Sequence, residues 1–239
     1  MKTNNFLLCV VLTFAWLLQG CNIATTVHFN KDYSGTYTTV LDLSDLIGMA
    51  GMFDTTGTMD QNKMVEEMRL SMDSLELEET YNSLSGIRDA QLDVSDEGVI
   101  SIGFKFDNVE ALNASFKSMQ ERTAQKMEGM GEGSMDMLPT DFLGGGDQLF
   151  IREGKTLTHA LNTEGGLGEG LMGEGGGDDM DMMSSMIDYT IDLSFDRKVK
   201  SVDVEGLTIV EKGTHVVKTR VDFANLLKDG KYSIKVRTK

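Results

Sequence analysis

Alternating apolar and polar residues predict β-hairpins near the start of the chain and in its middle. The first alternation covers 27–29 and 37–43, on either side of a short turn-forming sequence. A clearer one covers 90–94 and 100–106, around the Ser-Asp-Glu-Gly sequence at 95–98. Because successive side chains of a strand point to opposite faces, each pair predicts two antiparallel strands with one buried face.

Helical periodicity replaces alternation in two other segments. Residues 109–127 place apolar and charged side chains on opposite sides, which predicts an amphipathic helix capped by Asp107 and Glu110. Its buried stripe is expected to contain Val109, Leu112, Phe116, Met119 and Met127. An earlier helix is predicted after Thr58 and Gln61, which have the spacing of a capping box. Its apolar side is expected to contain Met64, Met68, Met72 and Leu75, as core packing.

The C-terminal part of the chain predicts strands only. A short hairpin is expected around Glu153-Gly154, and alternation returns from Tyr189 onward. The later strands are expected at 189–195, 199–204, 207–211, 214–223 and 232–236. The chain is therefore predicted to form one α+β domain over 21–239. An antiparallel, many-stranded sheet would carry two principal helices on one face.

Between residues 129 and 177 the composition changes, because 15 of these 49 residues are glycine. Such a stretch buries too little apolar surface to offset the entropy of ordering it. We therefore expect a mobile, acidic, Gly- and Met-rich excursion over 129–178 that surrounds the short hairpin. The sequence at 168–173 matches G-x-G-x-x-G, but no strand precedes it and Asp178-Asp179 would repel a pyrophosphate, which excludes a dinucleotide site.

The first 21 residues predict a secretory signal peptide followed by a lipid attachment site. The apolar run 6–18, broken only by Thr13, fits a signal peptide over 1–20 and is shorter than the ~18 residues that span a bilayer. It ends in Leu18-Gln19-Gly20-Cys21, which resembles the lipobox of bacterial lipoproteins, with Gln19 in place of the usual small residue. The resemblance implies cleavage before Cys21, a diacylglycerol on its sulfur and usually a third acyl chain on its amino group. Two or more chains anchor a protein stably.

The mature chain also resembles uncharacterised lipoproteins of Bacteroidota and, more loosely, the LppM-type lipoprotein domain. The residues that carry this resemblance are the hairpin sequence at 28–37 and the Asp-Gly-Lys-Tyr-Ser-Ile sequence at 229–234. It implies an envelope domain of unsettled function and no catalytic residue. No aspartate follows Cys21, which in enteric lipoproteins argues against inner-membrane retention. We expect the periplasmic side of the outer membrane, with the inner membrane and the cell surface as alternatives.

The charge distribution excludes nucleic acid as a partner. The formal net charge is −16, and it becomes −17 when the signal peptide with its single Lys2 is removed. Residues 21–196 hold 10 basic and 33 acidic residues, whereas 197–239 hold 11 and 5. A basic face, which phosphate contact needs, is therefore restricted to the C-terminal end. That end is interpreted as a solvated sheet face that balances the acidic body, or as a docking surface for an anionic partner.

Catalytic motifs are not found in the sequence. It contains no G-x-S-x-G, H-E-x-x-H or Walker sequence, and His28, His159 and His215 lie in separate strand signals. Cys9 lies in the signal peptide, so Cys21 has no partner for an internal disulfide. We predict no enzymatic activity and no cofactor.

One cluster suggests metal chemistry. Met180, Met182, Met183 and Met186 lie within seven residues, and Met127, Met130, Met135 and Met137 lie on the other flank of the excursion. Thioethers are soft ligands that select Cu(I), although the same methionines could form the apolar side of a short helix. We therefore expect a non-enzymatic lipoprotein that binds or scaffolds an envelope protein or a lipid ligand. Copper(I) handling is the alternative, and an envelope hydrolase is third.

Overall fold

The computed structural model describes residues 21–45, 47–48, 61–129, 149–162, 187–222, 226 and 231–239. In these ranges the chain forms eleven strands and three helices. The first half contains β1 (Asn22–Phe29), β2 (Gly35–Asp42), α3 (Gln61–Ser74), α4 (Leu77–Ser83), β3 (Ile87–Val94), β4 (Val99–Phe106) and α5 (Val109–Gly129). The second half contains β5 (Leu149–Glu153), β6 (Thr156–Asn162), β7 (Asp188–Phe195), β8 (Val199–Glu205), β9 (Leu207–Lys212), β10 (Val216–Val221) and β11 (Lys231–Thr238).

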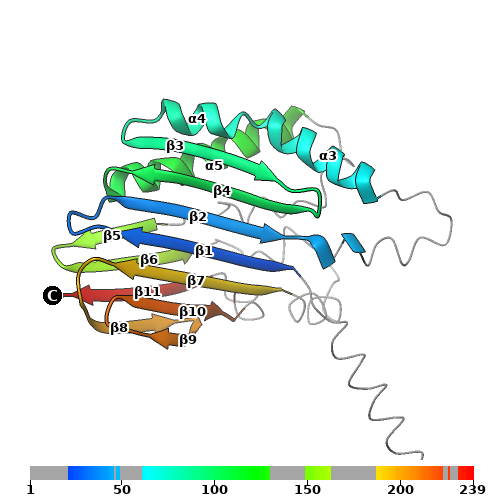
Figure 1. Ribbon diagram of the computed structural model, residues 1–239. Helices are drawn as coiled ribbons and strands as arrows, with labels where there is room; N and C mark the ends of the chain where they lie inside the picture. The colour runs from blue at the N-terminus through cyan, green and yellow to red at the C-terminus, as the bar shows by residue number, and fades with distance from the viewer. Residues whose placement is uncertain are drawn as a thin grey trace, which may run out of the picture.

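The strands form two sheets. The larger has the order β3-β4-β2-β1-β7-β10-β9 and the smaller has the order β5-β6-β11-β8 (Figure 1). The α+β class is confirmed, and the expected hairpins all form. The expectation of a single antiparallel sheet is corrected in two respects. There are two sheets, and β1 and β7 pair in parallel. Alternation fixes which face of a strand is buried, but it does not fix the neighbour with which the strand pairs.

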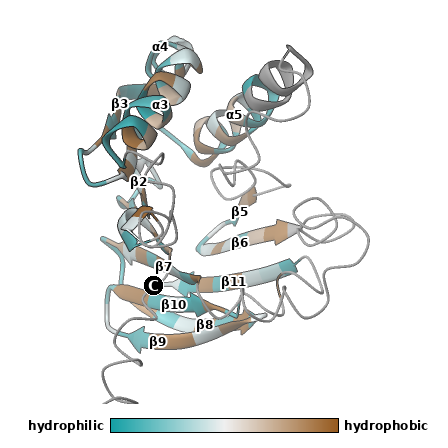
Figure 2. Cartoon of the chain, turned by 90° about the vertical axis from the view of Figure 1, so that its right-hand side faces the viewer, coloured by the Kyte–Doolittle hydropathy of each residue, from teal (hydrophilic) through white to brown (hydrophobic). Residues whose placement is uncertain are grey.

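The second layer of the fold combines a helix with the smaller sheet. Figure 2 shows α5 and the strands β5, β6, β11 and β8 opposite the larger sheet. Gly206, at a φ of 69°, joins β8 to β9 and so passes the chain from one sheet to the other. A positive φ is easily adopted by glycine, and a Cβ there would lie 2.8 Å from the main-chain oxygen of Lys231.

Aromatic rings fill the space between the layers at one end. Phe29 is fully buried, and its ring centroid lies 5.6 Å from that of Phe106, 5.7 Å from Phe150 and 5.5 Å from Phe195. Phe150 belongs to the smaller sheet, whereas the other three belong to the larger one. Phe29 therefore holds the two layers together.

The helices follow their predicted stripes with one correction at a cap. Val109, Leu112, Phe116 and Met119 of α5 are buried. Of the stripe predicted for α3, Met72 and Leu75 are buried, Met64 and Met68 are half-buried, and Val65, which was not predicted, is buried. The cap of α5 is Asn108, whose Oδ1 accepts a hydrogen bond from the Ala111 N–H at 2.8 Å. Asp107, the predicted cap, instead forms an ion pair with Arg88. The main-chain N–H of Asp107 still bonds to Gly86, so the helix begins one residue later.

Several predictions about the N-terminal helix and the glycine-rich excursion lie outside the described residues. They include the Thr58 cap, the side chain of Met127 and the stretches 130–148 and 163–186 with their methionines. α3 and α4 are two arms of one bent helix, because Glu76 between them has a φ of 51°. Among the helices described, none is long and apolar enough to cross a bilayer.

Candidate functional site

No linker separates Cys21 from the folded domain, because β1 begins at the next residue. Cys21 directly precedes β1, and its main-chain oxygen accepts a hydrogen bond from the Asp188 N–H of β7 at 3.0 Å. Only 4% of the residue is exposed. Burial, with the nearby Asp42 carboxylate, raises the pKa of the thiol to about 12, so the sulfur is not a thiolate at neutral pH. Anything attached to Cys21 is therefore attached directly at the N-terminal end of β1, an inner strand of the larger sheet.

The opposite end is built from three turns and the last two residues of the chain. The Arg197 Nε–H donates to the main-chain oxygen of Lys31 at 2.9 Å. The Thr238 N–H donates to the oxygen of Lys155 at 2.8 Å, and the Lys239 N–H donates to that of Lys198 at 2.9 Å. Segments 30–34, 152–155, 196–198 and 238–239 thus form one hydrogen-bonded unit, which we call the basic tip.

Tyr33 lies at the centre of the basic tip. It is 1% exposed, has a φ of 70°, and its hydroxyl lies 3.1 Å from the Thr238 Oγ1. The guanidinium of Arg152 lies 4.2 Å above its ring and that of Arg197 lies 5.8 Å away. Arg152 also donates to the main-chain oxygen of Asp32 at 3.4 Å. The Tyr33 ring and main-chain oxygens hold both arginines in place.

The basic tip carries an excess of positive charge in an acidic protein. Its cations are Lys31, Arg152, Lys155, Arg197, Lys198 and Lys239, and its carboxylates are Asp32, Glu153 and Asp196. Within the described part of the chain, none of the six cations forms a salt bridge with an acidic side chain. Nine such pairs lie elsewhere, and a tenth contact joins Asp196 of the tip to His28. The pKa of Asp32 is lowered, chiefly by hydrogen bonds from Ser34 and less by the Arg152 charge.

Sequence reasoning did not find the basic tip, because its cations are spread from residue 31 to residue 239. A signal did exist in the turns. Lys31 and Lys198 each follow a strand that ends in a buried phenylalanine, at Phe29 and Phe195, and Lys155 lies in the turn of a hairpin. Only the sheet order brings these turns to one end.

The open face of the larger sheet contains a serine, a histidine and an aspartate in contact. The Ser194 Oγ lies 3.0 Å from the His28 Nδ1, and the His28 Nε2 lies 3.5 Å from the Asp196 Oδ1. This order is that of a nucleophile, a base and its orienting acid. However, both strands lie inside the sheet, with their main-chain N–H groups in the pairings with β2, β1 and β10. Among the described residues, the main-chain N–H groups around Ser194 are engaged in the sheet and its turns, so they do not form the oxyanion site that acyl transfer uses.

The three histidines do not come together. His28 is on β1 and His159 is on β6, but His215 lies in the turn before β10 and not in a strand as predicted. His159 is fully buried, with its ring stacked on Phe150 at 4.1 Å. Burial lowers its pKa to about 3. In the described ranges, no group of three or more His, Cys, Asp or Glu residues has the geometry of a metal site.

The predicted basic face of the last strand forms as expected, with acidic neighbours. Lys231, Lys235 and Arg237 are exposed on β11, and the alternate residues Tyr232, Ile234 and Val236 are buried. Asp203 and Glu205 of β8 are paired in register with Lys235 and Ser233, and the Lys231 Nζ lies 3.9 Å from the Glu205 Oε1. Acidic side chains of β8 therefore lie beside this face, and one of its three cations forms a salt bridge with them.

The four methionines of the predicted metal site lie outside the described residues, and copper binding stays a prediction. If Met180, Met182, Met183 and Met186 bind Cu(I), changing all four to leucine should abolish binding and leave stability intact, because leucine keeps the apolar volume and removes the sulfur. Competition with a Cu(I) chelator measures the affinity. Affinity weaker than about micromolar, or unchanged in the leucine variant, would exclude a copper site of this kind.

Comparison with known proteins found one distant structural likeness. No family model matches the chain, and no curated protein matches it either. The NMR structure of the folded domain of LppM from Mycobacterium tuberculosis is 12% identical, and the match covers 92% of each chain with a TM-score of 0.39. The expected resemblance to the LppM-type domain is therefore supported only as a distant likeness, and neither an activity nor a partner follows from it.

Proposed function

We propose that the protein is a lipid-anchored envelope domain that binds a partner and carries out no chemistry on it. The observation that carries the proposal is the position of Cys21, which joins β1 without a tether and is hydrogen-bonded to Asp188 of β7. A short connection between a lipid and a rigid sheet restricts how the domain can tilt on the membrane. The anchor would thus set the direction in which the domain points.

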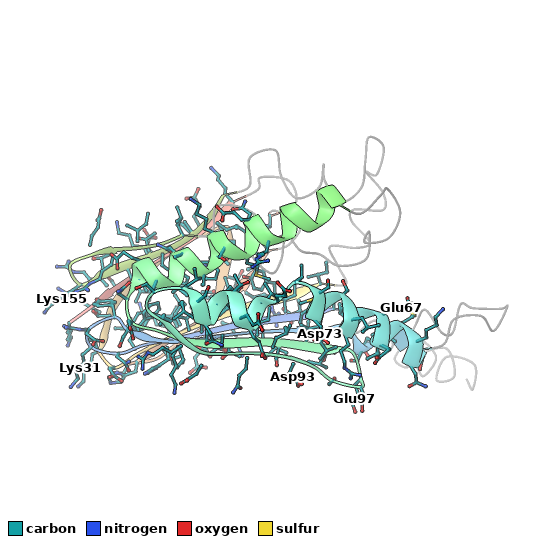
Figure 3. The ribbon with its side chains drawn as sticks, turned by 90° about the horizontal axis from the view of Figure 1, so that it is seen from above. Lys31, Glu67, Asp73, Asp93, Glu97 and Lys155 are labelled. Carbon is teal, nitrogen blue, oxygen red and sulfur yellow. The ribbon has the colours of Figure 1, made fainter. Side chains whose placement is uncertain are left out.

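The direction of β1 indicates which surface would face away from the membrane if Cys21 is the anchor. β1 has eight residues, and at about 3.3 Å per residue it spans roughly 26 Å from Cys21 to the turn that contains Lys31. In an upright domain the basic tip would therefore point into the periplasm. Figure 3 shows Lys31 and Lys155 at one end and Glu67, Asp73, Asp93 and Glu97 toward the other. The Leu43 N–H bonds to the Gly98 oxygen, so the Glu97 turn lies beside the end of β2 that is paired with Asn22 of β1.

A binding role agrees with the remaining chemistry of the described residues. The Ser194, His28 and Asp196 contact lacks an oxyanion site, and the buried hydroxyls bond to one another. The Thr25 Oγ1 lies 3.2 Å from the Thr39 Oγ1, and the Tyr189 hydroxyl lies 3.4 Å from that of Tyr232. These groups satisfy each other as parts of the core. We place the domain on the periplasmic side of the outer membrane.

The anchor is tested by comparing Cys21→Ser with Cys9→Ser in cells labelled with a fatty-acid analogue. Cys21→Ser should lose all label, because it removes the only thiol of the mature chain, whereas Cys9→Ser should be labelled as wild type. Density-gradient separation of the two membranes then reports where the labelled protein is located. Equal labelling of the two variants would refute the lipid anchor.

A further inference from the structure

We propose that the basic tip is a docking surface for an extended, carboxylate-bearing polymer of the envelope, the chemistry of a peptide-substituted cell-wall glycan. The inference deepens the proposed function, on which it rests for the envelope location and for the direction in which the tip points. Its own evidence is the set of six cations without salt bridges in the described residues, in a chain of net charge −16.

Most cations elsewhere are paired. Of the thirteen described outside the tip, eight form salt bridges, and the exceptions are Lys200, Lys212, Lys218, Lys235 and Arg237 on β8 to β11. Arg69 pairs with Glu66 and Asp96, and Lys105 pairs with Asp89. An acidic protein has many carboxylates with which to neutralise a lysine. The basic tip holds six side-chain cations against three side-chain carboxylates, and two of these carboxylates are engaged locally. Asp32 accepts hydrogen bonds from Ser34, and Asp196 contacts His28. A positive potential therefore persists at this end of the molecule.

The arginines of the tip are held in place before any partner arrives. The Arg197 Nε–H and Nη1–H donate to the oxygens of Lys31 and Lys239 at 2.9 and 3.4 Å. The Arg152 guanidinium lies over the Tyr33 ring and donates to the Gly154 oxygen at 3.3 Å. Both side chains have already lost the rotamer freedom that binding would otherwise remove. Each guanidinium still has N–H donors that these contacts do not use.

The arrangement of the cations favours separate single charges over one phosphate group. Phosphate sites gather several donors on one point, often at a glycine-rich loop or a helix N-terminus. Here Lys31, Lys155 and Lys198 are exposed on three different turns that form the end of the fold. Cations spaced in this way match carboxylates spaced along a polymer chain. An extended polymer can contact the tip without approaching the acidic body of the protein.

A bilayer surface is the less favoured partner. The proposed anchor already places a membrane at the other end of β1, roughly 26 Å away by strand length. A second planar anionic surface would also face the exposed Glu153 and Asp196. Charge repulsion between such a surface and the acidic body would oppose contact over a Debye length of about 10 Å at 0.1 M salt. We expect anionic vesicles not to bind.

The test uses the full chain held in nanodiscs of neutral phosphatidylcholine, with fluorescent polyglutamate as the probe and anisotropy as the readout. Lys31→Glu, Lys155→Glu and Lys198→Glu combined should weaken binding at least about tenfold at low salt, since each removes an unpaired cation from the tip. Wild-type binding should weaken as salt rises. The matched control combines Lys63→Glu, Lys117→Glu and Lys231→Glu, which changes the net charge equally at exposed pairs on α3, α5 and β11.

The outcomes distinguish an effect of the tip from an effect of net charge and from loss of the lipid anchor. The control should bind within about threefold of wild type, because surface pairs contribute little to stability and lie outside the tip. Absence of binding by wild type, or equal loss in the control, would overturn the inference. Competition by anionic vesicles or polyphosphate as strong as by polyglutamate, at equal charge, would also overturn it. Full-chain Cys21→Ser should bind polyglutamate normally, so failure of the lipid anchor and failure of the tip are distinguishable.

Discussion

Phe29→Ala should destabilise the protein by about 3–5 kcal/mol, a large part of the roughly 5–15 kcal/mol that stabilises a typical domain. The residue has 0% exposure, and its ring packs on Phe106, Phe195 and Phe150 at centroid distances of 5.5–5.7 Å. Removing it opens a cavity at the contact between the two layers. The unfolding midpoint should fall by on the order of 10 °C, measured by circular dichroism on the full chain.

Two variants on the same strand test whether the effect belongs to the layer contact. Phe29→Leu should lose less than half as much stability, because it retains most of the apolar volume. Thr26→Ala, three residues away on the exposed face of β1, should change stability by less than about 0.5 kcal/mol. A midpoint for Phe29→Ala close to that of Thr26→Ala would contradict the assignment of Phe29 as the contact between layers.

Acid should destabilise the fold through His159. Its pKa is lowered from 6.5 to about 3 by burial, so the native state stays unprotonated while the unfolded chain binds a proton. A depressed native pKa means that the unfolded state gains protons as the pH falls below 6.5. The stability present above that pH should therefore decline by about 1.4 kcal/mol per pH unit toward pH 3. Urea unfolding at pH 7, 6, 5 and 4.5 measures this slope.

His159→Phe isolates this effect from the carboxylates, which also destabilise proteins in acid. The variant keeps a ring against Phe150, where the His159 ring stacks at 4.1 Å, and removes the titrating group. It should be nearly insensitive to pH between 6.5 and 5. The control His28→Gln changes a partly exposed histidine and should keep the wild-type slope. Equal slopes for wild type and His159→Phe would show that His159 does not govern the acid sensitivity.

The residues that sequence reasoning placed well are those whose environment is local. Leu112 and Phe116 lie one turn apart on α5, and both are buried as the periodicity predicted. The turn at 95–98 forms as expected, with Gly98 at a φ of 84°. Helical periodicity and turn chemistry depend on neighbours within a few residues. The Asn108 cap shows the limit of this reasoning, because the end of the preceding strand decides where the helix begins.

The sequence by itself determined the α+β class, the strands with their buried faces, and the amphipathic helices. The structure extended the first strand, predicted from residue 27, back to Asn22 and so placed its start directly after Cys21. The tertiary structure alone decided the division into two sheets, the parallel pairing of β1 with β7 and the contact of Ser194 with His28. It also decided the basic tip, where Lys31 and Lys239 belong to one surface although they are 208 positions apart in the sequence. The physical reason is that alternation specifies a face, whereas partners are selected by packing between segments far apart in sequence.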